Sequence, residues 1–349
     1  QELKQNTYNL TRMNLVMRGI LPDNIVTRNG DTLETDWPYF DESDPVGTYH
    51  PLYVDAVVSN PPYSQNWDPS NKDVDPRYSY GLAPKSKADY AFLLHDLYHL
   101  RPEGIMTIVL PHGVLFRGGE EGAIRKNLIE HRHIEAIIGL PANIFFGTGI
   151  PTIIMVLRQK REASDVLIID ASKGFMKEGK QNKLRACDIK RITDTIVAHA
   201  DVDKYARVVG IDEIRDNDYN LNIPRYVDSS QATETWDIYA SMFGGIPTAE
   251  IDALGRYWAE WPNLRASLFE EDGTPYARLG TEDIAGVLAD HSDVAAFKAS
   301  FARSFEGFRD YLVRELVDDP ERVSIAEEES RISSEIFERL DGIGLIDRY

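Results

Sequence analysis

The sequence predicts an α/β fold, in which a mostly parallel sheet carries helices on both faces and a helical region follows the sheet. In the first two thirds of the chain, short apolar runs typical of buried strands alternate with segments of helical periodicity. Several of these runs stop at proline, glycine or an acidic residue, as strands do where the chain turns. The last third contains wide apolar stripes at helical spacing instead.

Two acidic residues lie at the ends of the first two predicted strands. Residues 1–3 form the end of one strand, residues 10–20 carry an apolar helix face, and residues 25–27 form a second apolar run. An acid at a strand end can bind ribose hydroxyls, as in dinucleotide-binding folds, and a second acid can accept from the exocyclic amine of adenine. We therefore interpret Glu2 and Asp31 as a nucleoside site, although each acid alone is more simply a solvated loop charge.

Residues 55–63 combine the pattern of a buried strand with an abrupt stop. The run has the length and composition of a parallel strand. It ends at Asn60-Pro61-Pro62-Tyr63, because the prolines cannot donate to a sheet ladder and push the preceding residues out of helical geometry. The Asn60 amide therefore lies at the carboxyl end of a strand, where ligands of open α/β sheets bind.

The chemistry of this corner suits a planar amino group. The Asn60 amide oxygen and the Pro61 carbonyl oxygen are two acceptors held by stiff backbone, and the Tyr63 ring can stack on a planar group. Two acceptors can hold an NH2 group and reduce the conjugation that it must lose before it attacks as a nucleophile. The simpler alternative is a proline-rich turn after a strand.

The following segments continue the alternation of strands and helices. Residues 64–87 are rich in Asn, Asp, Pro, Ser and Tyr, and a loop of this length either covers a substrate or is disordered. His112, His131 and His133 lack metal-ligand spacing, so we expect them to be structural. The predicted helices cover residues 88–100 and about 120–130, and the predicted strands cover residues 105–110, 134–140, 152–157 and 165–171.

A second informative loop spans residues 141–151 and places Phe145 and Phe146 before a glycine-rich turn. One ring can pack inward while the other stacks on a base, or both rings can belong to the core. Residues 158–191 then contain ten Lys and Arg against five Asp and Glu. This basic stretch can contact phosphates, and a solvated hairpin is an equally good interpretation.

Charge is distributed unevenly along the 349 residues. The formal net charge is -19, to which residues 1–228 contribute -5 and residues 229–349 contribute -14. A protein that binds DNA alone is expected to carry a basic face, so any DNA contact is expected to depend largely on another polypeptide. The single cysteine, Cys187, excludes a disulfide framework and suits a reducing cytoplasm. No apolar run approaches the roughly 18 residues that span a bilayer.

Residues 229–349 differ in character from the rest. They contain acidic helices with broad apolar stripes, one with Trp258 and Trp261 and a later one rich in phenylalanine. Such helices must bury their apolar faces against each other or against a partner. The sequence therefore predicts a helical C-terminal region that takes part in subunit contact.

Asn60-Pro61-Pro62-Tyr63 resembles the catalytic motif of S-adenosylmethionine-dependent amino-methyltransferases, in particular those that act on N6 of adenine. The order of segments along the chain is similar to that of the modification (methyltransferase) subunit of type I restriction-modification systems. The resemblance covers residues 1 to about 228 and extends to the tail mainly in its helical character. The segments that carry it are residues 6–15, 55–63, 89–104, 144–151 and 218–226.

The resemblance implies a Rossmann-like methyltransferase sheet in residues 1–228, incomplete at its N-terminus, with Thr152–Leu157 as an inserted antiparallel strand. It implies that S-adenosyl-L-methionine is bound by Glu2 at the ribose and by Asp31 at the adenine amine, with Phe92 lining the pocket. The catalytic motif, including Pro62, would hold the target N6, and Tyr63 would stack on the flipped base. Phe145, or less readily Phe146, would close its other side. The reaction needs neither a metal nor a dedicated general base.

One feature of the family is expected upstream of Gln1, namely the glycine-rich loop that wraps the methionine part of the cofactor. We therefore expect an N-terminally truncated fragment with little cofactor affinity and little activity alone. The resemblance implies four partners, namely DNA, the specificity subunit, the restriction subunit and a second modification subunit. The alternatives are a protein glutamine N5-methyltransferase and a non-catalytic assembly module, residues 229–349, that docks a specificity subunit.

Overall fold

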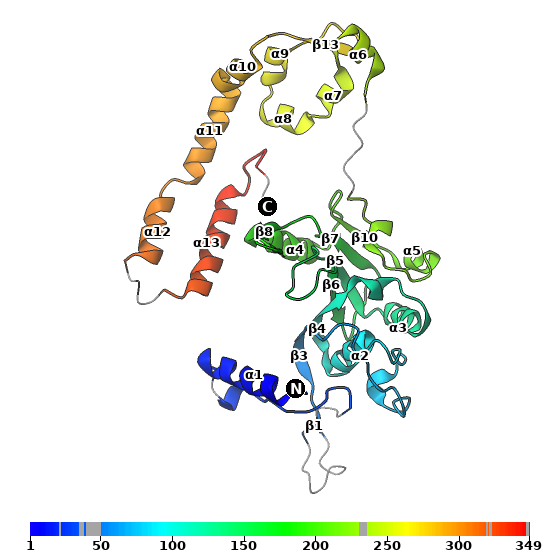
Figure 1. Cartoon of the computed structure of the whole chain (residues 1–349). Coiled ribbons are helices and arrows are strands. Elements are labelled where there is room, and N and C mark those ends of the chain that lie inside the picture. Colours follow the sequence, from blue (N-terminus) through cyan, green and yellow to red (C-terminus); the bar gives the residue numbers. More distant parts are fainter. Residues whose placement is uncertain are drawn as a thin grey trace. The chain divides into compact units, whose positions relative to one another are not determined.

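The computed structural model describes residues 1–20, 22–34, 38–39, 50–229, 236–318, 320, 323–346 and 349. The chain folds into two compact units, Gln1–Ser230 and Gln231–Tyr349, which are considered separately below (Figure 1). No helix in these described ranges is both long enough and apolar enough to cross a membrane.

A six-stranded sheet organises the first unit. Its strand order is β10-β7-β5-β6-β4-β3, in which β3 runs parallel to β4 and β5 runs parallel to β7. Strand β6 is antiparallel to both of its neighbours, as predicted for residues 152–157, and β10 is antiparallel to β7. The strands are β3 (Val54–Ser59), β4 (Leu100–Pro111), β5 (Ile134–Gly139), β6 (Thr152–Arg158), β7 (Val166–Asp170) and β10 (Ala206–Val209).

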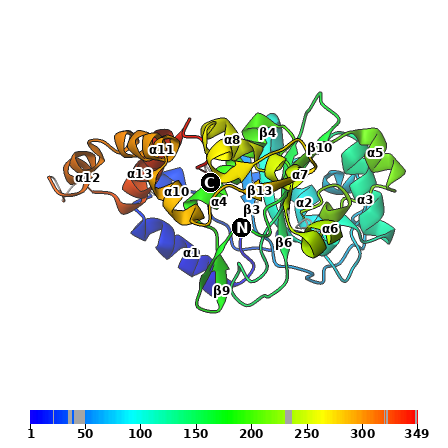
Figure 2. The ribbon, with the colours of Figure 1, turned by 90° about the horizontal axis from the view of Figure 1, so that it is seen from above.

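Helices cover both faces of this sheet, because successive side chains of each central strand point to opposite sides. Ile137 packs into the apolar cluster that includes residues of α2, α3 and α5, whereas Ile138 packs into the cluster that includes α4 (Figure 2). The helices of this unit are α1 (Gln5–Met17), α2 (Asp89–Tyr98), α3 (Gly119–Glu130), α4 (Ala186–Ala198) and α5 (Ile211–Asp216). Short 3-10 turns cover Pro22–Asn24, Pro76–Tyr78, His112–Leu115 and Ile223–Arg225.

Two small ribbons complete the described part of the first unit. Strands β1 (Pro38–Tyr39) and β2 (His50–Pro51) form one, and strands β8 (Met176–Glu178) and β9 (Gln181–Lys183) form the other. The second ribbon lies within the stretch for which a solvated hairpin was one of the two interpretations.

The expected strand at residues 25–27 does not form. A single parallel bridge joins Glu2 to Asn29, and its backbone bonds run from Glu2 to Arg28 and from Gly30 to Glu2. Among the described residues only Glu2 forms a bridge with this segment, so no second pair of residues extends the bridge into a strand. The position of Glu2 beside the segment that leads to Asp31 is nevertheless the predicted one.

Residues 64–87 are attached to the body of the first unit, and Gln65 near their start lines the cavity described below. Trp67 and Tyr78 pack against each other in the core, with ring centroids 5.2 Å apart. Arg77 is 3% exposed and donates to the carbonyl oxygens of Thr32 and Leu33. The sequence suggested a loop because the segment lacks periodicity, but buried aromatic and arginine side chains attach it to the body of the unit.

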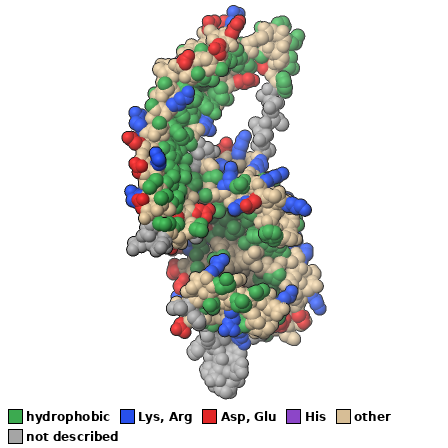
Figure 3. All heavy atoms as spheres, turned by 60° about the vertical axis from the view of Figure 1, so that its left-hand side comes forward, with side chains coloured by type: hydrophobic (Ala, Val, Ile, Leu, Met, Phe, Trp, Pro, Cys, Tyr) green, Lys and Arg blue, Asp and Glu red, His purple; other side chains and the backbone are tan. Residues whose placement is uncertain are grey.

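The second unit is mostly helical and contains a small sheet that the sequence did not suggest. Its core contains Leu264, Leu268 and Val294, with Trp258 and Trp261 packed against them. Hydrophobic side chains form a stripe along its helices (Figure 3). The helices are α6 (Ile238–Phe243), α7 (Thr248–Asp252), α8 (Gly255–Glu260), α9 (Leu264–Leu268), α10 (Ile284–Asp290), α11 (Ser292–Ser304), α12 (Phe308–Leu316) and α13 (Ile325–Leu340), and the strands are β11 (Ile246–Pro247), β12 (Phe269–Glu270) and β13 (Tyr276–Leu279).

Candidate active site

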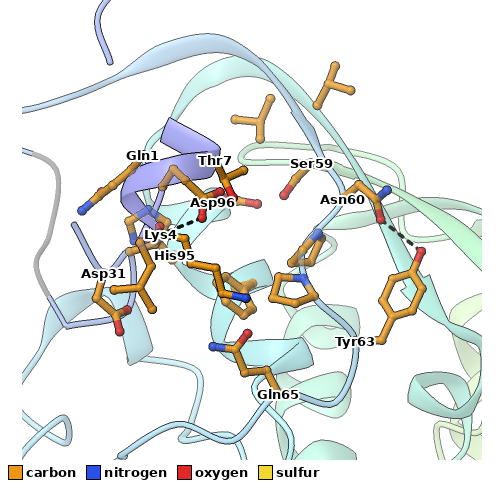
Figure 4. Close-up of a pocket in the computed structure, with 18 of the residues that line it drawn as sticks. Gln1, Lys4, Thr7, Asp31, Ser59, Asn60, Tyr63, Gln65, His95 and Asp96 are labelled. Atoms are coloured by element: carbon orange, nitrogen blue, oxygen red, sulfur yellow. Dashed lines mark hydrogen bonds between the residues drawn. The ribbon is translucent and has the colours of Figure 1, made fainter. Parts of the chain in front are cut away.

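A cavity of about 1170 Å³ lies beside β3 and extends past its carboxyl end. Figure 4 shows Asp31 and the Asn60–Tyr63 corner on opposite sides of it, with Asp96 between them in this view. The fold therefore brings together side chains from segments far apart in the sequence. All of the candidate site residues line this one cavity: Glu2, Asp31, Asn60, Pro61, Pro62, Tyr63, Phe92, Phe145 and Phe146.

The Asn60 side chain is exposed to this cavity and does not point into the core. The Tyr63 hydroxyl donates a hydrogen bond of 3.0 Å to the Asn60 Oδ1 atom. Because an amide oxygen has two lone pairs, Oδ1 retains capacity to accept from a ligand. Pro61 is buried, which fixes the backbone next to the amide. The corner thus presents an oriented acceptor to the cavity.

Asp89 holds the turn that follows Tyr63, a role that sequence reasoning missed. Its fully buried carboxylate accepts from the Ser64 backbone amide at 2.7 Å and from Arg117 at 3.3 Å. Ser64 has a φ of 50°, and this bond satisfies its amide in the left-handed conformation. The sequence signal was an acid in the first turn of the next helix, which also favours the helix electrostatically.

Glu2 and Asp31 each use one carboxylate oxygen locally. Glu2 Oε1 accepts from the Lys4 backbone amide at 3.0 Å, and Asp31 Oδ1 accepts from the Leu33 amide at 2.9 Å. Among the described residues, no hydrogen bond to the second oxygen of either acid is present. Each side chain is therefore oriented by its own backbone while one oxygen remains for a ligand.

Asp96 is a second residue that the sequence did not single out. It lies one helical turn after Phe92 on the same face of α2, and both residues line the cavity. Its Oδ2 atom is buried and accepts no hydrogen bond from any described residue. Burial raises the pKa of Asp96 to about 6, although a hydrogen bond from Ser59 lowers it in part. The signal available was an acid one turn after Phe92, on a helix face that also carries His95.

Replacing Asp96 by Asn should stabilise the protein in a pH-dependent way. The fold raises the pKa of Asp96 from 3.8 to about 6, so folding favours the protonated acid, and stability falls as the pH rises from about 4 to about 6 and stays lower above that. The gain in the free energy of unfolding should be up to about 3 kcal/mol at pH 8 and should shrink toward pH 4. Urea unfolding of both proteins across this range would measure it, and a gain independent of pH would contradict the prediction.

The three aromatic side chains of the cavity have different surroundings. Phe92 is half-buried on α2 and packs against the core. Phe145 packs against the apolar cluster on the α4 side of the sheet, whereas Phe146 is 91% exposed. Of the two adjacent rings, Phe145 is therefore anchored against the core and Phe146 is exposed, and both line the cavity.

The residues present fit a cationic adenosine-containing cofactor. Three carboxylates, from Glu2, Asp31 and Asp96, face a cavity that is also lined by apolar side chains such as Val57 and Phe92. The uncompensated Oδ2 of Asp96 is a buried acceptor for which a positively charged or hydrogen-donating ligand would compensate. The second oxygens of the other two acids suit ribose hydroxyls and an exocyclic amine.

The chain is similar to proteins of a known family. The model of the N-6 DNA Methylase family matches residues 1–235. The chain is 39% identical over 245 residues to the type I restriction enzyme MpnII methylase subunit of Mycoplasma pneumoniae, which covers 68% of this chain and 44% of that protein. It is 32% identical over 261 residues to the HindI methylase subunit of Haemophilus influenzae, covering 72% and 54%.

The solved structure of the type I restriction-modification system methyltransferase subunit from Streptococcus thermophilus is also similar. It matches with 50% sequence identity and a TM-score of 0.62, covering 66% of this chain and 48% of that one. The chain thus spans about half the length of the relatives that it matches. The Rossmann-like methyltransferase fold expected from the sequence is confirmed by this likeness.

Proposed function

The chain belongs to the N-6 DNA methylase family, and on that premise we propose that it takes part in methylating N6 of adenine in DNA with S-adenosyl-L-methionine. The observation that supports this proposal most directly is the shared cavity. The Asn60 corner opens into the same cavity as Glu2, Asp31 and the aromatic side chains. One site can therefore hold a nucleoside cofactor and a base side by side.

In this proposal the cofactor lies along the acidic side of the cavity. Glu2 binds its ribose hydroxyls, Asp31 accepts from its adenine amine, and Phe92 packs beside it. When bound, the cofactor supplies an electrophilic methyl group on a positively charged sulfur. Asp96 adds a negative charge to the same wall, which favours a cationic ligand. The roles of these residues are our proposal.

The target adenine leaves the DNA stack to reach Asn60, at a cost of a few kcal/mol. Tyr63 stacks on one face of the base, and Phe145 or Phe146 closes the other. The Asn60 Oδ1 atom and the Pro61 carbonyl oxygen accept from the N6 amine. These bonds bias the nitrogen toward tetrahedral geometry, which releases its lone pair from conjugation with the ring.

We further propose that the protein acts as the modification subunit of a type I restriction-modification complex in the cytoplasm. Its net charge of -19 makes extensive unaided DNA binding unfavourable, so a specificity subunit supplies the sequence contacts. The restriction subunit and a second modification subunit complete the complex. The hydrophobic stripe of the second unit is a surface suited to such assembly (Figure 3).

Transfer of a labelled methyl group distinguishes these functions. The assembled complex is incubated with labelled S-adenosyl-L-methionine and either duplex DNA or a protein substrate, and the labelled product is digested. Label in N6-methyladenine supports the proposal. Label on a protein glutamine amide would replace it with glutamine methylation, and no transfer with retained subunit binding would leave an assembly role.

A further inference from the structure

The β8–β9 hairpin is hydrogen-bonded to the loop that carries the two phenylalanines. The Asn182 backbone amide donates to the Asn143 carbonyl oxygen at 3.0 Å, and the Asn182 side-chain amide donates to the Ala142 carbonyl oxygen at 2.7 Å. Leu184, just after the hairpin, packs against the same apolar cluster as Phe145. One asparagine therefore joins the hairpin to residues two and three positions before Phe145.

The hairpin also carries a local excess of positive charge. Residues 173–185 contain five Lys and Arg and one acidic residue, in a chain whose net charge is -19. The side chains of Lys177 and Lys180 are exposed, and neither forms an ion pair or hydrogen bond with any described residue. Among the described residues the Lys183 ammonium pairs with Glu178, at 3.5 Å and with both side chains more than half exposed, so this ion pair is weak and Lys183 can also contact an anion.

The position of the hairpin suits contact with a long anionic molecule. It projects from the body of the first unit (Figure 2) and pairs with no other strand of the described chain. Lys180 lies in the two-residue turn at its tip, after Gly179, whose φ is 63°. A two-stranded ribbon has little stability of its own, so the bonds through Asn182 also hold the ribbon against the unit.

We propose that the β8–β9 hairpin binds the sugar–phosphate backbone of DNA beside the flipped base, and that Asn182 couples this contact to the position of the aromatic loop. The proposal rests on the DNA methylation proposed above. Lys177 and Lys180 contact phosphates, which position the duplex without reading its sequence. Asn182 is a positioning residue, because it touches the loop and not the base.

The lysine contacts are tested by the salt dependence of DNA binding. In the assembled complex, Lys177→Gln with Lys180→Gln should lower the slope of log affinity against log salt concentration by about 2, because each lost phosphate contact removes about 0.9. The matched control is Lys204→Gln with Lys298→Gln, two other exposed lysines. An unchanged slope, or an equal fall in the control, would overturn the proposal.

The positioning role needs a readout at the base itself. Asn182→Asp is isosteric but removes the donor to Ala142, and Gln181→Glu makes the same charge change at the preceding residue of β9. With 2-aminopurine in place of the target adenine, Asn182→Asp should show a smaller fluorescence rise on DNA binding and a kcat about tenfold lower, with KM for DNA little changed. Equal effects of both variants, or none, would overturn the coupling.

Measurements on the wild-type complex distinguish a failure of the proposed DNA methylation from a failure of the hairpin proposal. If it neither binds nor methylates DNA, the proposed function fails and the hairpin proposal fails with it. If it does both while the lysine and Asn182 variants behave as their controls do, only the hairpin proposal is wrong. Thermal unfolding of each variant identifies a loss that comes from misfolding.

Discussion

Replacing Asn60 by Ala should lower methyl transfer by about two to three orders of magnitude while the protein remains folded. The side chain is exposed to the cavity, so its removal creates no void in the core. The substitution removes a hydrogen-bond acceptor that is already oriented before the base binds. Removing one such preorganised group typically lowers kcat by about two to three orders of magnitude. The Tyr63 hydroxyl loses its acceptor, Asn60 Oδ1, at the same time. Single-turnover methylation by the assembled complex of a duplex containing one target would measure the rate of transfer.

The matched control is Asn66→Ala, which removes an exposed asparagine six residues away that does not line the cavity. Its rate should stay close to that of the wild type. Circular dichroism and the binding of cofactor to both variants would establish that the site is otherwise intact. Methylation by Asn60→Ala at the wild-type rate would show that the corner does not act on the target amine.

The sequence predicted the sheet and the cavity from the places where strands end. Apolar runs identify strands, and the proline pair at Pro61 and Pro62 fixes the end of β3 with little ambiguity. Glu2 and Asn60 do line one cavity, as this reasoning predicted, although Glu2 forms only an isolated bridge to Asn29 and not a strand of the sheet. These signals are local in the sequence, so they can be read without knowledge of the tertiary packing.

Residues whose role depends on packing could not be found in this way. Arg77 lies in a segment without periodicity, yet its guanidinium reaches carbonyl groups more than forty residues away. The environment of Asp96 depends on the burial of one carboxylate oxygen, which no spacing reveals. The link from Asn182 to Ala142 likewise joins two loops that approach each other only in the folded unit.

Arg77→Met should destabilise the first unit by about 3 kcal/mol and weaken cofactor binding. The 3% exposed guanidinium donates to both oxygens of Asp75, and it binds the carbonyls of Thr32 and Leu33 next to Asp31. Methionine fills a similar volume but removes the guanidinium donor from Asp75 and from the two carbonyl oxygens, and breaking one partner of a buried charge network costs several kcal/mol. Because Asp31 is attached to this segment, its proposed contact with the cofactor should loosen as well.

An exposed arginine provides the contrast that makes this prediction specific. Arg101 bonds Asp55 at 2.8 Å, but 53% of the Arg101 side chain and 82% of the Asp55 side chain are exposed, so Arg101→Met should cost less than about 1 kcal/mol. Urea unfolding would compare the two variants, and calorimetry with S-adenosyl-L-methionine would compare their affinities in the assembled complex. Equal losses in both variants would mean that the Arg77 network does not hold the Asp31 segment in the position that binds the cofactor.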